Sequence, residues 1–193
     1  MYSISKDAAL AAASTCVFVL LWSSGAIFSK WGLAHASPFA FLLIRFAIAL
    51  LALVLLIPLL KLQRPRGARA VRYALATGAV LLGAYQIFYM LALSLHITPG
   101  VMATVMGVQP ILTAVILERR LCWSRLLGLF LGLAGLILVV YQGIGLAGMS
   151  WQGMLFAVLA LGSMTFGTLM QKRITHNPLG TLPLQYLAGL VVC

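Results

Sequence analysis

The chain has 193 residues, of which 63% are hydrophobic and only 8% are charged. A domain of this size leaves much of its surface exposed, so the composition excludes an ordinary soluble protein and indicates one embedded in lipid. The net charge of +11 does not predict a nucleic-acid partner, because the basic residues lie in short gaps between apolar runs and form no face with interleaved aromatics.

Seven apolar segments are candidate membrane helices, since a span needs about 20 mostly apolar residues. The uncharged stretch 126–171 is divided at residues 143–150, where glycines and Ser150 favour a turn. The sequence therefore predicts an all-α polytopic membrane protein. The candidate spans are 9–29, 39–60, 73–95, 99–117, 126–142 and 152–171, with a seventh that begins near Leu179 and is still running at Cys193.

The first two spans contain candidate substrate-binding residues. Trp22 and Ser24 lie in the first span, where a hydroxyl either contacts substrate or bonds a neighbouring helix. Arg45 is the one charge in the second, about 10 Å inside its outer end. A cation at this depth faces a water-filled cavity, where it would bind substrate or act in gating. Alternatively, it snorkels to the headgroups or makes a structural hydrogen bond.

The third and fourth spans add further candidates. Tyr85 and Tyr89 stand four residues apart on one helix face, with Gly78 and Ala92 near that face; they either line a cavity or pack between helices. Gln109 shares a face of the fourth span with Met102, Met106 and Thr113. Pro110 removes a backbone donor and is expected to kink the helix, which makes it a candidate gating residue.

The fifth span contains the small-residue pattern Gly128-x-x-x-Gly132. Such a surface packs closely, either within the protein or between two copies, so a homodimer through this helix face is one interpretation. Neither a cluster of metal-ligand residues nor a phosphate-binding loop occurs, so no metal, cofactor or enzymatic activity is predicted.

The basic residues predict the orientation of the chain. Eleven of the thirteen Lys and Arg residues fall on one side of the membrane if the N-terminus is cytoplasmic, whereas only Lys30 falls on the other. This agrees with the positive-inside rule and predicts a multi-pass protein of the cytoplasmic (inner) membrane.

The chain contains the start of an internal repeat. Pro178, Gln185 and Tyr186 lie 140 positions after Pro38, Arg45 and Phe46, respectively. Five spans precede Trp151, an odd number, so a second copy must insert upside down. Inverted repeats are typical of secondary transporters, which bind substrate near the midplane between the halves. Gln185, as the counterpart of Arg45, joins the candidate substrate residues.

We expect residues 1–145 to form the first five-helix repeat and residues 151–193 to begin the second. From Leu179 to Cys193 a helix extends only about 22 Å, which is short of a roughly 30 Å hydrocarbon core. The expectation is therefore a fragment with about seven of ten helices.

Several motifs resemble one family of transporters. Four groups of motifs resemble the first, second, fourth and fifth helices of EamA-like (RhaT-type) members of the drug/metabolite transporter superfamily. They are, in that order, LWSS (21–24) with KWGL (30–33); SP (37–38) with RF (45–46); TPG (98–100) through QP (109–110) to ERR (118–120); and GLFLGLAG (128–135). The resemblance implies ten helices in two inverted halves and movement of small metabolites, often export of amino acids or related compounds.

The sequence as a whole predicts a secondary transporter that moves a small-molecule substrate by alternating access. The alternatives are a structural or assembly subunit of a membrane complex, which would need no second half, and a multispanning membrane enzyme. The enzyme would need a cluster of His, Asp, Glu or Cys at one membrane face, and the sequence has none.

Overall fold

The structure is a computed structural model and describes residues 6–59, 65, 67–117, 123–140, 150–174 and 178–193. Two compact units make up the chain, Met1–Ala36 and Ser37–Cys193. Within the described residues the regular structure is entirely helical. The predicted all-α fold is therefore confirmed.

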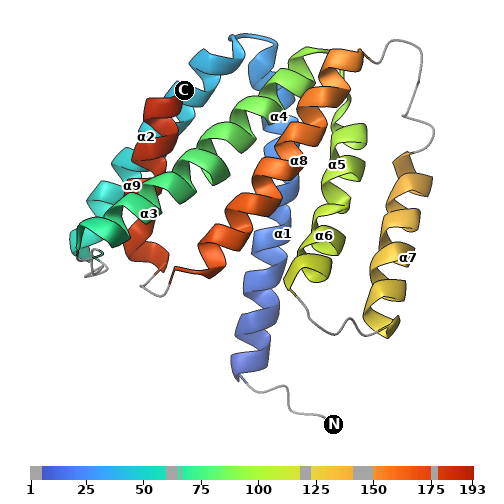
Figure 1. Cartoon of the computed structure of the whole chain (residues 1–193), viewed down its shortest axis with the longest axis horizontal. Coiled ribbons are helices and arrows are strands. Elements are labelled where there is room, and N and C mark those ends of the chain that lie inside the picture. Colours follow the sequence, from blue (N-terminus) through green and yellow to red (C-terminus); the bar gives the residue numbers. More distant parts are fainter. Residues whose placement is uncertain (1–5, 60–64, 66, 118–122, 141–149, 175–177) are drawn as a thin grey trace. The chain divides into compact units, whose positions relative to one another are not determined.

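Each of the seven predicted spans coincides with helix, although the third begins at Ala68, before its predicted start at 73. The third predicted span is a continuous run of three segments, and the fourth is divided in two (Figure 1). The elements are α1 (Lys6–Leu33), α2 (Pro38–Leu59), α3 (Ala68–Gly78), the π-helical segment η1 (Ala79–Ala84), α4 (Tyr85–Ser94), α5 (Pro99–Gly107), α6 (Gln109–Leu117), α7 (Trp123–Val140), α8 (Trp151–Lys172) and α9 (Pro178–Val192).

Five of the spans are long and apolar enough to cross a membrane by themselves. They are the helical runs 10–33, 38–58, 68–94, 99–117 and 151–172; α7 and α9 contain shorter apolar stretches, Leu126–Leu138 and Leu179–Val192. The chain is thus a polytopic membrane protein. The predicted turn at 143–149, the end of the first predicted repeat, and the ERR motif at 118–120 lie outside the described residues.

The first unit contains α1, a helix of 28 residues. At about 1.5 Å per residue it extends roughly 42 Å, enough to cross the hydrocarbon core. Its serines near the middle bond to carbonyl groups one turn earlier, as Ser23 does to Leu20 at 3.1 Å. Such bonds satisfy hydroxyl groups inside an apolar helix without a partner helix.

In the second unit, the third span and α8 run antiparallel. The Tyr73 hydroxyl, near the start of α3, donates to the Met170 carbonyl near the end of α8 at 3.3 Å. At the opposite end, the Ser150 hydroxyl donates to the Leu95 carbonyl at 2.8 Å and accepts from the Gly153 N–H at 3.0 Å, capping α8. These two bonds hold both ends of the helix pair together.

Two glycines allow the helices to approach closely. An added methyl group on Gly78 would lie 2.8 Å from the backbone carbonyl carbon of Gln185 in α9. On α8, a methyl group on Gly167 would lie 2.9 Å from the Cα atom of Leu81 in η1. Small residues permit such backbone contact in membrane bundles. The third span is therefore packed between α8 and α9.

The π-helical segment changes which residues share a face of the third span. Gly78 packs against α9, whereas Tyr85 and Ala92 belong to a buried cluster with Ala157 and Ala160 of α8. The expectation that Gly78 shares a face with Tyr85 is therefore wrong. A π-turn adds one residue to the helix, which rotates all following side chains relative to those before it.

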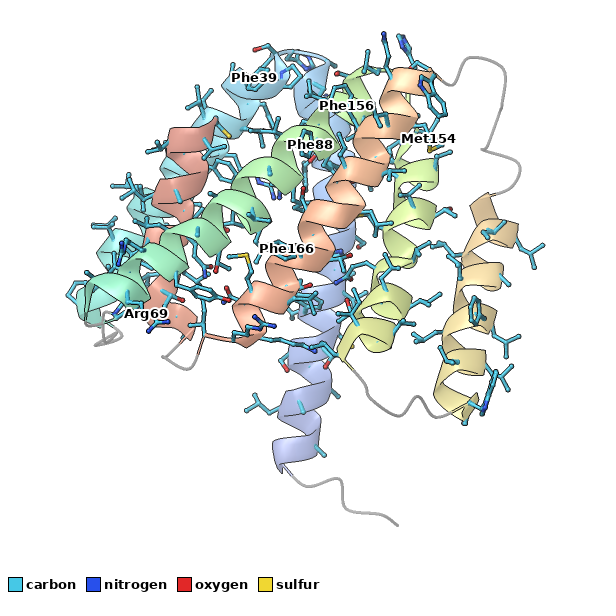
Figure 2. All side chains as sticks on the ribbon, viewed as in Figure 1. Phe39, Arg69, Phe88, Met154, Phe156 and Phe166 are labelled. Carbon is cyan, nitrogen blue, oxygen red and sulfur yellow. The ribbon has the colours of Figure 1, made fainter. Side chains whose placement is uncertain are left out.

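The apolar core of the second unit lies between α4, α5 and α8. Phe88 and Phe156 point toward one another from α4 and α8 (Figure 2), with stacked rings and centroids 6.1 Å apart. In Figure 1, α8 lies between the third span and the α5–α6 pair, both of which it contacts. The described faces of α2 and α7 that point outward carry exposed leucines, isoleucines and phenylalanines, as expected for contact with lipid.

Candidate functional site

Arg45 and the two predicted tyrosines come together in the second unit. The Arg45 guanidinium donates from Nη1 to the Oε1 of Gln86 at 3.5 Å, joining α2 to α4. The rings of Tyr85 and Tyr89, on either side of Gln86 in α4, have centroids 5.8 Å apart. Arg45 is close enough to both tyrosines to interact electrostatically. We call Arg45, Tyr85, Gln86 and Tyr89 the Arg45 cluster.

The local structure explains why the side chain of Arg45 reaches α4. Leu42 and Phe46 are fully buried one turn apart on α2. Arg45 lies at the edge of this buried face and remains exposed. On the facing helix, Tyr85 is the first residue after η1, so the π-turn sets the direction in which the tyrosines and Gln86 point.

The Arg45 cluster provides one cation, one amide and two phenol groups. The hydrogen-bond partner of Arg45 within the described residues is a neutral amide, which leaves its charge uncompensated. Guanidinium groups bind carboxylates in a forked, charge-assisted geometry. Tyrosine rings supply an apolar wall with a polar end. Such a site suits a small molecule that has a carboxylate and an apolar part.

Gln185 does not join this cluster. Its side chain is almost completely buried, and its Nε2 donates to Oε1 of Gln171 on α8 at 2.6 Å. Its backbone contacts Gly78. Gln185 therefore links α8 to α9 in the structure, and its role as a substrate residue stays a prediction.

Gln109 and Pro110 lie where the fourth span is interrupted. The helix ends at Gly107 and restarts at Gln109, with Val108 between them in a turn. The Gln109 side chain donates to the Thr113 hydroxyl at 3.4 Å within α6. Pro110 in the first turn of α6 has no N–H to bond the preceding helix. The proposed gating role of Pro110 and the substrate contact of Gln109 stay predictions.

Trp22 and Ser24 belong to the first unit, Met1–Ala36. Trp22 stacks on Phe18 with ring centroids 5.7 Å apart. The Ser24 hydroxyl donates to the Leu21 carbonyl at 3.0 Å. Both side chains are thus engaged within α1, and their contact with substrate stays a prediction.

Gly128 and Gly132 lie on an open face of α7. A methyl group added to either glycine would meet no atom within 4 Å. This face is free to pack against another helix in the described structure, whether in the same protein or in a second copy. The predicted homodimer is not tested by this geometry.

Sequence reasoning missed two glutamines that connect helices. Gln86 bonds Arg45, and Gln171 bonds Gln185. Both could have been selected from the sequence, because an amide inside an apolar span needs a hydrogen-bond partner on another helix. Among the described residues, no three His, Cys, Asp or Glu side chains are grouped as metal ligands would be.

The chain matches the sequence profile of a known protein family. The sequence profile of the EamA-like transporter family matches residues 9–141, about two thirds of the chain. The matched region begins in α1 and runs through α7, so it includes the Arg45 cluster. No curated protein and no solved structure is significantly similar to the chain.

Proposed function

The chain belongs to the EamA-like transporter family, and on that premise we propose that it exports small metabolites, such as amino acids or related compounds, across the cytoplasmic membrane. Membership of the family makes the chain a membrane transporter of the drug/metabolite superfamily and favours transport over catalysis. The proposal adds the substrate class, the direction and the residues that bind the substrate.

The Arg45 cluster is the observation that carries the proposed substrate class. Ionisable residues inside membrane spans are costly, and those that occur usually line substrate or ion pathways. Arg45 bonds the neutral amide of Gln86, which stands between Tyr85 and Tyr89 in α4, and its charge acts on both tyrosines. A substrate carboxylate would supply the missing negative charge, and the tyrosine rings would contact the apolar part of the same molecule.

A contact between the proposed repeats supports alternating access. We assign residues 1–145 to the first repeat and residues 151–193 to the start of a second, inverted one. Phe46 and Tyr186, which occupy equivalent positions in the two copies, pack edge to face with ring centroids 5.9 Å apart. A twofold axis in the membrane plane brings equivalent residues together only near that axis, and substrate sites of such transporters lie near the repeat interface.

The charge distribution supports a cytoplasmic N-terminus. Tyr73 and Met170 bond near one end of the second unit, and the exposed residues Arg69, Arg72, Lys172 and Arg173 lie at that same end. The opposite end, where Ser150 bonds Leu95, has no Lys or Arg between residues 94 and 98 or 150 and 153. By the positive-inside rule the basic end faces the cytoplasm.

Efflux from whole cells tests the proposal. Cells with and without the chain are loaded with a panel of amino acids and related metabolites, and release is followed over time. We expect faster release of one or a few carboxylate-bearing compounds when the chain is present. Arg45→Gln, which retains hydrogen bonding but removes the charge, should slow this release about tenfold or more, as expected for loss of a charge-assisted contact.

The matched control is Lys172→Gln, which removes a basic side chain from the end of α8. It should leave efflux unchanged at equal membrane abundance. Equal efflux from cells with and without the chain across the whole panel would contradict the transport proposal. Normal efflux by Arg45→Gln would contradict the assignment of Arg45 alone.

A further inference from the structure

An apolar cavity of about 380 Å³ lies between α2, α3 and α9. Val54 and Ile57 of α2 form one wall, and Pro183 and Leu187 of α9 form another. Val71 closes it from the start of α3. The described side chains that line it are all apolar, so the cavity offers an occupant few hydrogen-bonding groups. It is therefore suited to a hydrocarbon chain rather than to a polar metabolite.

The cavity lies at the basic end of the second unit. Ile57 belongs to the last turn of α2, and Val71 to the first turn of α3. On either side of Val71, Arg69 and Arg72 are exposed; Figure 2 shows Arg69 at this end of α3. The sequence from 61 to 72 contains five basic residues and no acidic residue. An apolar cavity thus lies within one helical turn of two cationic side chains.

We propose that this cavity binds one acyl chain of an anionic phospholipid, whose phosphate group interacts with Arg69 and Arg72. An acyl chain needs no hydrogen-bond partner, which matches the apolar lining. Basic residues beside a membrane attract anionic lipids, and their charge is best satisfied by a headgroup that carries net negative charge. The two features together select an anionic lipid over a neutral one.

The lipid site is separate from the Arg45 cluster. Arg45 lies in the first half of α2, whereas Val54 and Ile57 lie in its second half. No residue of the Arg45 cluster lines the cavity. The lipid site therefore does not rest on the proposed transport function, and either can fail without the other.

Photocrosslinking tests the site. The full chain is reconstituted into phosphatidylcholine nanodiscs that contain a small fraction of one photoreactive lipid. This lipid is either phosphatidylglycerol or phosphatidylcholine, with the same photoreactive acyl chain in both. Labelled peptides are identified by mass spectrometry. We expect phosphatidylglycerol to label the second half of α2 or the first half of α9 about tenfold more than phosphatidylcholine, because two cations beside the cavity attract its headgroup. Equal labelling by the two lipids would overturn the proposal.

Two pairs of variants separate the headgroup from the acyl chain. Arg69→Gln with Arg72→Gln should abolish the preference for phosphatidylglycerol, whereas Lys172→Gln with Arg173→Gln, on a helix that does not line the cavity, should keep it. Val54→Phe should fill the cavity and reduce labelling by both lipids, whereas Val191→Phe, at an exposed position of α9, should not. A preference that survives the first pair of arginine changes, or labelling that survives Val54→Phe, would overturn the proposal.

Discussion

Arg45 occupies a turn of α2 in which its neighbours Leu42 and Phe46 are buried. Packing of these two residues holds this turn of the helix in place. Within the described residues, the guanidinium at the edge of the packed face bonds the neutral amide of Gln86. A central arginine costs roughly 2.5–3.5 kcal/mol on insertion scales. The hydrogen bond to Gln86 offsets part of this cost, and a bound carboxylate would offset more.

Replacing Gln86 by glutamate tests whether the Arg45 charge is used. Gln86→Glu has nearly the same shape but gives Arg45 an internal carboxylate. The new ion pair should compete with a substrate carboxylate and raise the apparent KM for efflux about tenfold or more. Transport kinetics in everted vesicles measure this change. The matched control is Gln152→Glu, at an exposed position in the first turn of α8, and it should leave KM unchanged. If Gln86→Glu also left KM unchanged, Arg45 would not contact substrate.

Replacing Gln185 is expected to change the thermal stability of the protein rather than its affinity for substrate. Gln185→Leu leaves the amide of Gln171 without its partner, and hydrogen bonds between membrane helices contribute about 0.5–2 kcal/mol. The thermal midpoint in detergent should therefore fall. Gln171→Leu combined with Gln185→Leu should recover part of the loss, because no amide is then left unpaired. A raised KM at unchanged thermal stability would instead favour Gln185 as a substrate residue.

Single helices show how sequence and structure diverge. The bounds of α2, α8 and the fourth span could be predicted within about two residues from hydropathy, because lipid exposure selects apolar composition along the whole length. The third span begins at Ala68 rather than 73. Its first turns carry Arg69 and Arg72, which are exposed at the basic end, where charged side chains are tolerated. A helix start predicted from apolar composition is therefore placed too far toward the C-terminus.

The π-helical turn of η1 could not be predicted from the sequence. Its residues, AVLLGA, are ordinary for an α-helical span. The turn depends on tertiary packing, since η1 lies against α8 through Gly167 and against α9 through Gly83. Of the candidate site, Arg45 could be selected from its charge and the two tyrosines from their spacing. That they meet around Gln86 depends on tertiary packing and on the rotation that η1 introduces.

The close approach of α8 to η1 makes a prediction about two glycines on one helix. Gly167→Ala would place a methyl group 2.8 Å from the Cβ atom of Leu81, whereas Gly162→Ala meets no atom within 4 Å. Overpacking of this kind costs about 1–3 kcal/mol. Thermal unfolding in detergent should show a lower midpoint for Gly167→Ala and an unchanged or slightly higher one for Gly162→Ala. Equal midpoints would mean that α8 and η1 are further apart than described.

At the scale of the whole molecule, the boundary between the compact units differs from the boundary between the proposed repeats. The compact units are Met1–Ala36 and Ser37–Cys193, whereas the proposed repeats divide between 145 and 151. Within Ser37–Cys193, α9 of the proposed second repeat contacts α2 and the third span of the proposed first repeat, as expected if the two repeats pack against one another.

The inverted repeat makes a prediction about membrane sidedness. If α1 and α8 are equivalent helices of opposite direction, the segments that follow them lie on opposite sides of the membrane. In a background with Cys16, Cys122 and Cys193 replaced by alanine, Ser37→Cys should react with a membrane-impermeant maleimide in intact cells. Arg173→Cys should react only after the cells are permeabilised, because the basic end of α8 faces the cytoplasm. Labelling of both positions from the same side would show that α1 and α8 run in the same direction, which an inverted repeat does not allow.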